Sequence, residues 1–111
     1  PRLIGEARAR ALALTAEPLK AEKAEAWGLI YKCVDDAALA DEARKLCEHF
    51  ATAPTAGLAL IKRAFDASAT NSLDAQLDLE RDLQREAGFN PDYAEGVRAF
   101  MEKRKPNYQH R

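Results

Sequence analysis

The feature that most constrains the fold is a nearly unbroken series of amphipathic helical segments, joined by linkers of only a few residues. One short stretch, residues 29–34, has the composition of a strand, with Tyr31 between Ile30 and Val34. A lone strand cannot build a sheet within the chain. The sequence therefore predicts an all-α module of about five to six helices with at most one short strand near 30–34, whose partner strand would lie outside this chain.

Local capping signals place the expected helices. We expect them over residues 6–14 and 20–27, from a cap at Asp35 or Asp36 to about 52, from 54 onward, from Asn71 or Ser72 to 88, and from 91 onward. Gly28 suits the left-handed position past a helix end, and Pro54 suits a first helical position. The run 90–92 (Asn-Pro-Asp) has the order of cap, first-turn proline and first-turn acid. Lys20 is a poor cap for the helix it precedes.

Charge and cysteine content exclude several classes of protein. The 17 bases and 18 acids give a net charge of −1, so there is no global basic field to attract nucleic acid or a membrane surface. Adjacent bases occur only as short runs, such as 62–63 and 103–105. Cys33 and Cys47 lie at no metal or redox spacing, and no apolar run is long enough for a membrane span. We expect a cytoplasmic protein with reduced cysteines, no nucleic-acid partner and no membrane partner.

Catalytic constellations are scarce. The two histidines, His49 and His110, lack further ligands at zinc spacing, and there is no phosphate loop or nucleophile elbow. We expect no metal site and no catalytic residue in this chain, and hence no turnover by the chain alone. The unusual carboxylate is Glu80, which forms a polar stripe with Gln76 and Gln84 inside an apolar arc. We expect Glu80 to meet a base or a backbone donor from another helix or subunit, with the two glutamines bonding beside it. The alternative is that the arc is only half buried and the stripe stays solvated.

The last helix combines an apolar face with a basic end. Val97, Phe100 and Met101 share one face, and Lys103 is the first of three bases at the helix end, where the dipole favours cations. If the helix continues, Phe100 and Lys103 project from one side of it. The pair can then pack a ring against an apolar ligand while the amine meets a phosphate. A solvated basic helix end is the alternative.

Four segments in order resemble one known family. Residues 1–5 (PRLIG), 21–30 (AEKAEAWGLI), 54–65 (PTAGLALIKRAF) and 95–106 (EGVRAFMEKRKP) are similar to the enoyl-CoA hydratase/isomerase (crotonase) superfamily. Residues 71–88 most resemble its branch of acyl-CoA isomerases that act in phenylacetate catabolism. The resemblance implies that residues 1–111 form the C-terminal helical region of such an enzyme. It also implies that the N-terminal catalytic core, with its acids and oxyanion hole, precedes Pro1 and is absent.

The same resemblance implies a ligand and partners. Family members place the ring at Phe100 and the amine at Lys103 against CoA bound to a neighbouring subunit, and they assemble as trimers that often pair into hexamers. A CoA thioester is then the substrate, and no cofactor is bound covalently. The alternatives are a portion of a fatty-acid enoyl-CoA hydratase, or a helical interaction module without a ligand.

Overall fold

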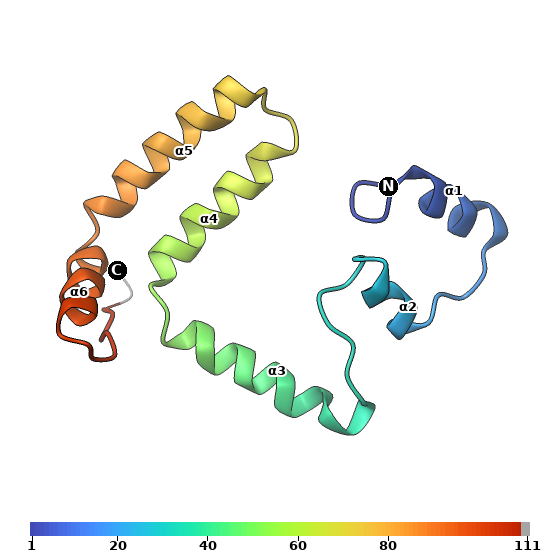
Figure 1. Cartoon of the computed structure of the whole chain (residues 1–111), viewed down its shortest axis with the longest axis horizontal. Helices are drawn as coiled ribbons and strands as arrows, with labels where there is room; N and C mark the ends of the chain where they lie inside the picture. Colours follow the sequence, from blue (N-terminus) through green and yellow to red (C-terminus); the bar gives the residue numbers. More distant parts are fainter. Residues whose placement is uncertain (110–111) are drawn as a thin grey trace. The chain divides into compact units, whose positions relative to one another are not determined.

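The computed structural model describes residues 1–109, and the histidine at 110 lies outside this part. Within it the chain forms six α-helices and no strand (Figure 1). The helices are α1 (Glu6–Thr15), α2 (Ala21–Ala26), α3 (Asp36–Ala51), α4 (Thr55–Ser68), α5 (Leu73–Gly88) and α6 (Pro91–Met101). The all-α prediction is confirmed. The strand-like residues 29–34 form bends and irregular backbone between α2 and α3.

Contacts divide the chain into two compact units, Pro1–Glu42 and Ala43–Arg111. In the first unit the Trp27 ring lies near two cations, 5.0 Å from Arg8 Cζ and 4.7 Å from Lys23 Nζ, contacts that the aromatic quadrupole favours. Gly28 follows with a φ of 74°, the left-handed conformation expected after α2. Lys20 makes no side-chain cap, also as expected.

The second unit contains a helical hairpin, in which α4 packs against α5, followed by α6, which contacts α5 (Figure 1). The helix starts follow the sequence signals closely. Ser72 Oγ accepts a hydrogen bond from the Ala75 N–H at 3.3 Å at the start of α5. Asn90 caps α6 and Pro91 occupies its first position. Pro54 was placed wrongly by one residue: it is the N-cap of α4, because its ψ of 89° is not helical.

The second unit buries little of its apolar surface. Among the described residues, the side chains below a tenth exposed in this unit are Leu83, Asp92 and Ala99. Phe65 on α4 is 73% exposed and Phe100 on α6 is 82% exposed. Apolar residues exposed on this scale commonly mark surfaces that another element or subunit covers. The helical faces described here are therefore open to a partner or a ligand.

Candidate ligand-binding face on the last helix

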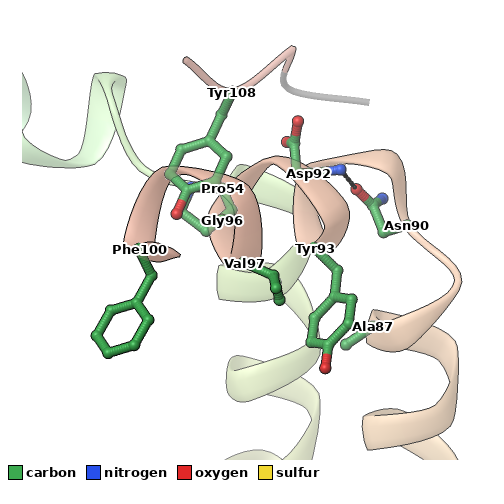
Figure 2. A pocket seen from close by; sticks show the side chains of 10 residues that line it. Pro54, Ala87, Asn90, Asp92, Tyr93, Gly96, Val97, Phe100 and Tyr108 are labelled. Carbon is green, nitrogen blue, oxygen red and sulfur yellow. Dashed lines mark hydrogen bonds between the residues drawn. The ribbon is translucent and has the colours of Figure 1, made fainter. Parts of the chain in front are cut away.

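Helix α6 carries two neighbouring strips of side chains with different contacts. At 100° per residue, Tyr93, Val97 and Phe100 fall within one arc. Asp92, Glu95 and Gly96 fall within the next arc. Figure 2 shows the first set projecting on one side of α6, while Tyr108 from the following segment lies over Gly96. The first strip lines a cavity that Asp92 and Gly96 also border, while Asp92 and Glu95 bind the tail, which we define as residues 102–109.

The cavity has a volume of about 420 Å³ and a mostly apolar lining. It is bounded by the start of α4, the end of α5, helix α6 and the tail (Figure 2). Its polar groups include Asn90, whose Oδ1 accepts a hydrogen bond from the Asp92 N–H at 2.9 Å. An apolar hollow with a few polar groups is the usual form of a small-molecule site. Its lining residues are Pro54, Gly57, Ala87, Asn90, Asp92, Tyr93, Gly96, Val97, Phe100 and Tyr108.

Of the two predicted site residues, Phe100 lines this cavity while 82% of it stays exposed. Lys103 does not line it, and it lies beyond the end of α6 at Met101. Lys103 thus lies at the helix end, as expected, but the helix does not continue through it, so the two residues do not project from one continuous helix. The reason is a left-handed turn, because the φ of Lys103 is 53°.

Backbone hydrogen bonds define this turn. The Lys103 N–H donates to the Phe100 carbonyl at 3.2 Å, and the Arg104 N–H donates to the Ala99 carbonyl at 3.0 Å. This is the Schellman pattern, in which glycine usually takes the left-handed position. Lysine in that position costs roughly 1–2 kcal/mol because its Cβ crowds the carbonyl that follows. The turn therefore holds Lys103 in an unfavourable backbone conformation.

The three bases after α6 differ in their partners. Arg104 pairs with Glu95, at 2.6 Å from Nη1 to Oε1, and with Glu102. Within residues 1–109, neither Lys103 nor Lys105 has an ion-pair partner. The guanidinium of Arg104 is thus already engaged, whereas no ion pair within residues 1–109 involves the amine of Lys103.

Two carboxylates of α6 anchor the tail. Glu95 accepts from the Arg104 guanidinium and from the Asn107 N–H at 2.8 Å. Asp92, which is 3% exposed, accepts from the Gln109 N–H at 2.7 Å. The bonds from Arg104 and Asn107 lower the pKa of Glu95 to about 2, since hydrogen bonds to a carboxylate favour its charged form. Glu95 therefore stays ionised at neutral pH.

Sequence reasoning assigned no role to Glu95 or Tyr108, and it assigned Asp92 only the place of a first-turn acid. Glu95 and Arg104 are nine residues apart, which is not a helical pairing distance. A glycine at 103 would have signalled the chain reversal, but the sequence has lysine there. The partial signal was the presence of Glu95 in the segment 95–106 that resembles the family.

The polar stripe on α5 is satisfied differently from the prediction. Glu80 is exposed and accepts from Gln76 Nε2 on its own helix at 2.8 Å. Gln76 provides the contact to another helix, since its Nε2 also donates to the Ala64 carbonyl of α4 at 3.2 Å. The expected donor to Glu80 from another helix is absent among the described residues. Gln76 does bond beside Glu80, as predicted.

Residues 1–109 contain no cluster of three or more metal-ligating side chains, and none of their helices is long and apolar enough to cross a membrane. His49 lies on α3, where its ring meets that of Phe50 edge-on with centroids 5.5 Å apart. Cys33 and Cys47 are free thiols. Partial burial raises the pKa of the Cys33 thiol, and nearby carboxylates raise it further. Both effects disfavour the reactive thiolate.

Comparison with known proteins decides the family. The model of the protein family described as "Enoyl-CoA hydratase/isomerase" matches residues 1–111. The chain belongs to the enoyl-CoA hydratase/isomerase family. The resemblance to crotonase-type enzymes is thereby confirmed.

Individual relatives carry different activities in their names. The chain is 56% identical over 108 residues to 1,2-epoxyphenylacetyl-CoA isomerase of Escherichia coli K12, which covers 97% of the chain and 41% of that protein. It is 45% identical over 108 residues to a probable enoyl-CoA hydratase of Rhodobacter capsulatus, covering 97% of the chain and 42% of that protein. The chain thus spans about two fifths of the length of these relatives.

The structure of the chain also matches a solved family member. A putative enoyl-CoA hydratase/isomerase from Mycobacterium abscessus superposes with a TM-score of 0.94 at 34% identity, covering 100% of the chain and 43% of that protein. The six helices described here therefore form a helical module of a crotonase-type fold.

Proposed function

We propose that the chain is the C-terminal assembly and CoA-binding portion of an acyl-CoA isomerase that acts on 2-(1,2-epoxy-1,2-dihydrophenyl)acetyl-CoA in phenylacetate catabolism. The observation that carries this is the 56% identity to the Escherichia coli isomerase. A CoA thioester is the substrate, and no covalently bound cofactor is required. The acids and oxyanion donors of the reaction come from outside this chain.

The geometry of α6 supports the role in CoA binding. An exposed aromatic ring, Phe100, lines an apolar cavity, and three residues later Lys103 offers a cation without a partner among the described residues. A ring can pack on adenine while an ammonium meets a phosphate. The open apolar faces of α4 and α6 support the role in assembly, with a trimer or hexamer as the product.

A portion of an enoyl-CoA hydratase is the second candidate, favoured by the 45% identity to the Rhodobacter capsulatus protein. One assay separates the two. The intact protein that carries this chain is given the ring epoxide and, separately, a straight-chain enoyl-CoA. We expect faster isomerisation of the epoxide than hydration of the enoyl-CoA. The opposite order would favour the hydratase, and no reaction with either substrate would favour a helical interaction module.

A charge reversal tests the CoA contact itself. In the intact protein, Lys103→Glu is expected to raise KM for acyl-CoA by roughly 10- to 100-fold, because a charge-assisted hydrogen bond contributes about 1.5–3 kcal/mol. A thioester analogue without the CoA nucleotide should be little affected. Lys105→Glu, with the same charge change in the same tail, is the matched control and should have a much smaller effect. Equal losses on both thioesters would indicate a folding defect instead.

A further inference from the structure

We propose that Glu95 is a positioning residue for Lys103. By holding Arg104 and Asn107 on α6, Glu95 fixes the left-handed turn from which the Lys103 amine meets an anion of CoA. This inference rests on the CoA contact proposed above and extends it to a residue that faces the tail rather than the cavity. Glu95 itself touches no ligand.

The backbone of Lys103 is fixed from both sides. The Lys103 N–H donates to the Phe100 carbonyl, and the N–H of the next residue, Arg104, donates to the Ala99 carbonyl. The side chain of Arg104 then returns to Glu95 through two separate bonds, at 2.6 and 3.1 Å. Lys103 thus lies in a short loop whose two ends are both attached to α6.

Glu95 provides a tighter attachment than an ordinary surface pair. Its side chain is 18% exposed and that of Arg104 is 38% exposed, against 68% and 71% for the Glu6–Arg10 pair of α1. Bidentate pairing fixes the guanidinium in orientation as well as in distance. The Asn107 N–H donates to Oε1 of the same carboxylate at 2.8 Å, so Glu95 holds the tail on both sides of Pro106.

The side-chain contacts of Lys103 do not explain its backbone conformation. A non-glycine residue remains in the left-handed region only when its surroundings impose it, and such residues concentrate at ligand clamps. The side chain of Lys103 has no ion-pair partner within residues 1–109 that would hold it there. Backbone bonds to Phe100 and Ala99 define the turn, and the pairing of Arg104 with Glu95 holds the residue that follows Lys103 on α6.

The test measures binding of coenzyme A to the intact protein by calorimetry. We expect Lys103→Ala to raise Kd about tenfold, and Glu95→Gln to raise it by a similar factor. In the double variant the losses should not add, because Glu95 acts through the amine that Lys103→Ala removes. Glu102→Gln is the matched control, since it removes the other carboxylate from Arg104 while leaving Glu95 in place. Its Kd should stay within about twofold of the unmodified protein.

The outcomes distinguish a failure of the positioning role of Glu95 from a failure of the CoA contact at Lys103. Loss of affinity in Lys103→Ala with wild-type affinity in Glu95→Gln would overturn the positioning role alone. Losses that add in the double variant would show that Glu95 has only a structural role, and would overturn it as well. Unchanged affinity in Lys103→Ala would overturn the CoA contact and this inference together. If Glu95→Gln does not fold, Arg104→Lys keeps the charge but loses the bidentate pairing, and it is expected to show the same coupled loss.

Discussion

Arg104 reaches back nine residues to Glu95, with Nη1 2.6 Å from Oε1 and Nη2 3.1 Å from Oε2. The pair fastens the segment after α6 to the middle of that helix. Ordinary helix rules pair residues three or four apart, so this contact belongs to the turn at Lys103 rather than to the helix. Four expectations follow from it and from the packing around it.

The first concerns acid stability. The pKa of Glu95 is lowered from 4.5 to about 2 in the folded chain. A depressed carboxyl pKa contributes stability that is complete above the unfolded pKa and is lost as pH falls toward the folded one. In the intact protein we expect Glu95→Gln to be less stable than wild type at pH 6, with the difference shrinking from about pH 4.5 downward. Urea unfolding at pH 6, 4 and 3 measures this, and a constant difference across the series would contradict it.

The second concerns the two non-glycine residues with positive φ in the described chain, Ala16 and Lys103, both at 53°. Glycine adopts this conformation without the Cβ penalty. Lys103→Gly and Ala16→Gly are each expected to raise the unfolding free energy, by up to about 1 kcal/mol, in thermal unfolding of the intact protein. Affinity for coenzyme A should fall in Lys103→Gly alone. A stabilised Lys103→Gly variant with full affinity would argue against the CoA contact.

The third compares two helical glycines. A Cβ on Gly96 would lie 3.3 Å from Tyr108 Oη, whereas a Cβ on Gly88 would have no neighbour within 4 Å. Alanine in a helix is favoured over glycine by about 0.8–1.0 kcal/mol. We expect Gly88→Ala to gain most of this, and Gly96→Ala to gain less or to lose stability because Tyr108 must shift. Equal gains in chemical denaturation would show that Tyr108 does not rest on α6.

The fourth concerns the contact between α4 and α5. Gln76 donates to the Ala64 carbonyl and to Glu80, and its Oε1 accepts from Asn71 Nδ2 at 3.0 Å. Gln76→Ala is expected to lower the unfolding free energy by about 1 kcal/mol, the usual net contribution of such bonds. Gln84, eight residues on and exposed, is the control, and Gln84→Ala should change stability by less than half as much. Similar losses in both would place the effect in helix packing rather than in these bonds.

Local rules were sufficient for the helices. Ser72 and Asn90 cap α5 and α6 as expected, because each cap depends on residues within one turn. The same rules erred by one residue at Pro54, where the fixed φ of proline suits a cap as well as a first helical position. The strand-like composition of 29–34 produced no strand, since strand formation needs a partner that composition alone does not supply.

The site was predictable only in part. Helical spacing placed Phe100 on an apolar face, and the structure puts it on the cavity, whereas the role proposed for it in CoA binding comes from the family resemblance. Lys103 was expected at the helix end, where it lies, but sequence gives no sign of the left-handed turn when lysine stands where glycine is usual. Glu95 could not be assigned from spacing, because its partner becomes near only after the chain has reversed.

Along residues 107–109 of the tail, backbone N–H groups that have a protein acceptor alternate with one that has none in the described part of the chain. The N–H groups of Asn107 and Gln109 donate to Glu95 and Asp92, while that of Tyr108 has no protein acceptor in the described part of the chain. Chain ends ordinarily fray, so their amide protons exchange with solvent almost freely. Here slow exchange at 107 and 109 should flank fast exchange at 108. A deuterium-labelling experiment could therefore report, one amide at a time and without any ligand, whether the tail is seated on α6.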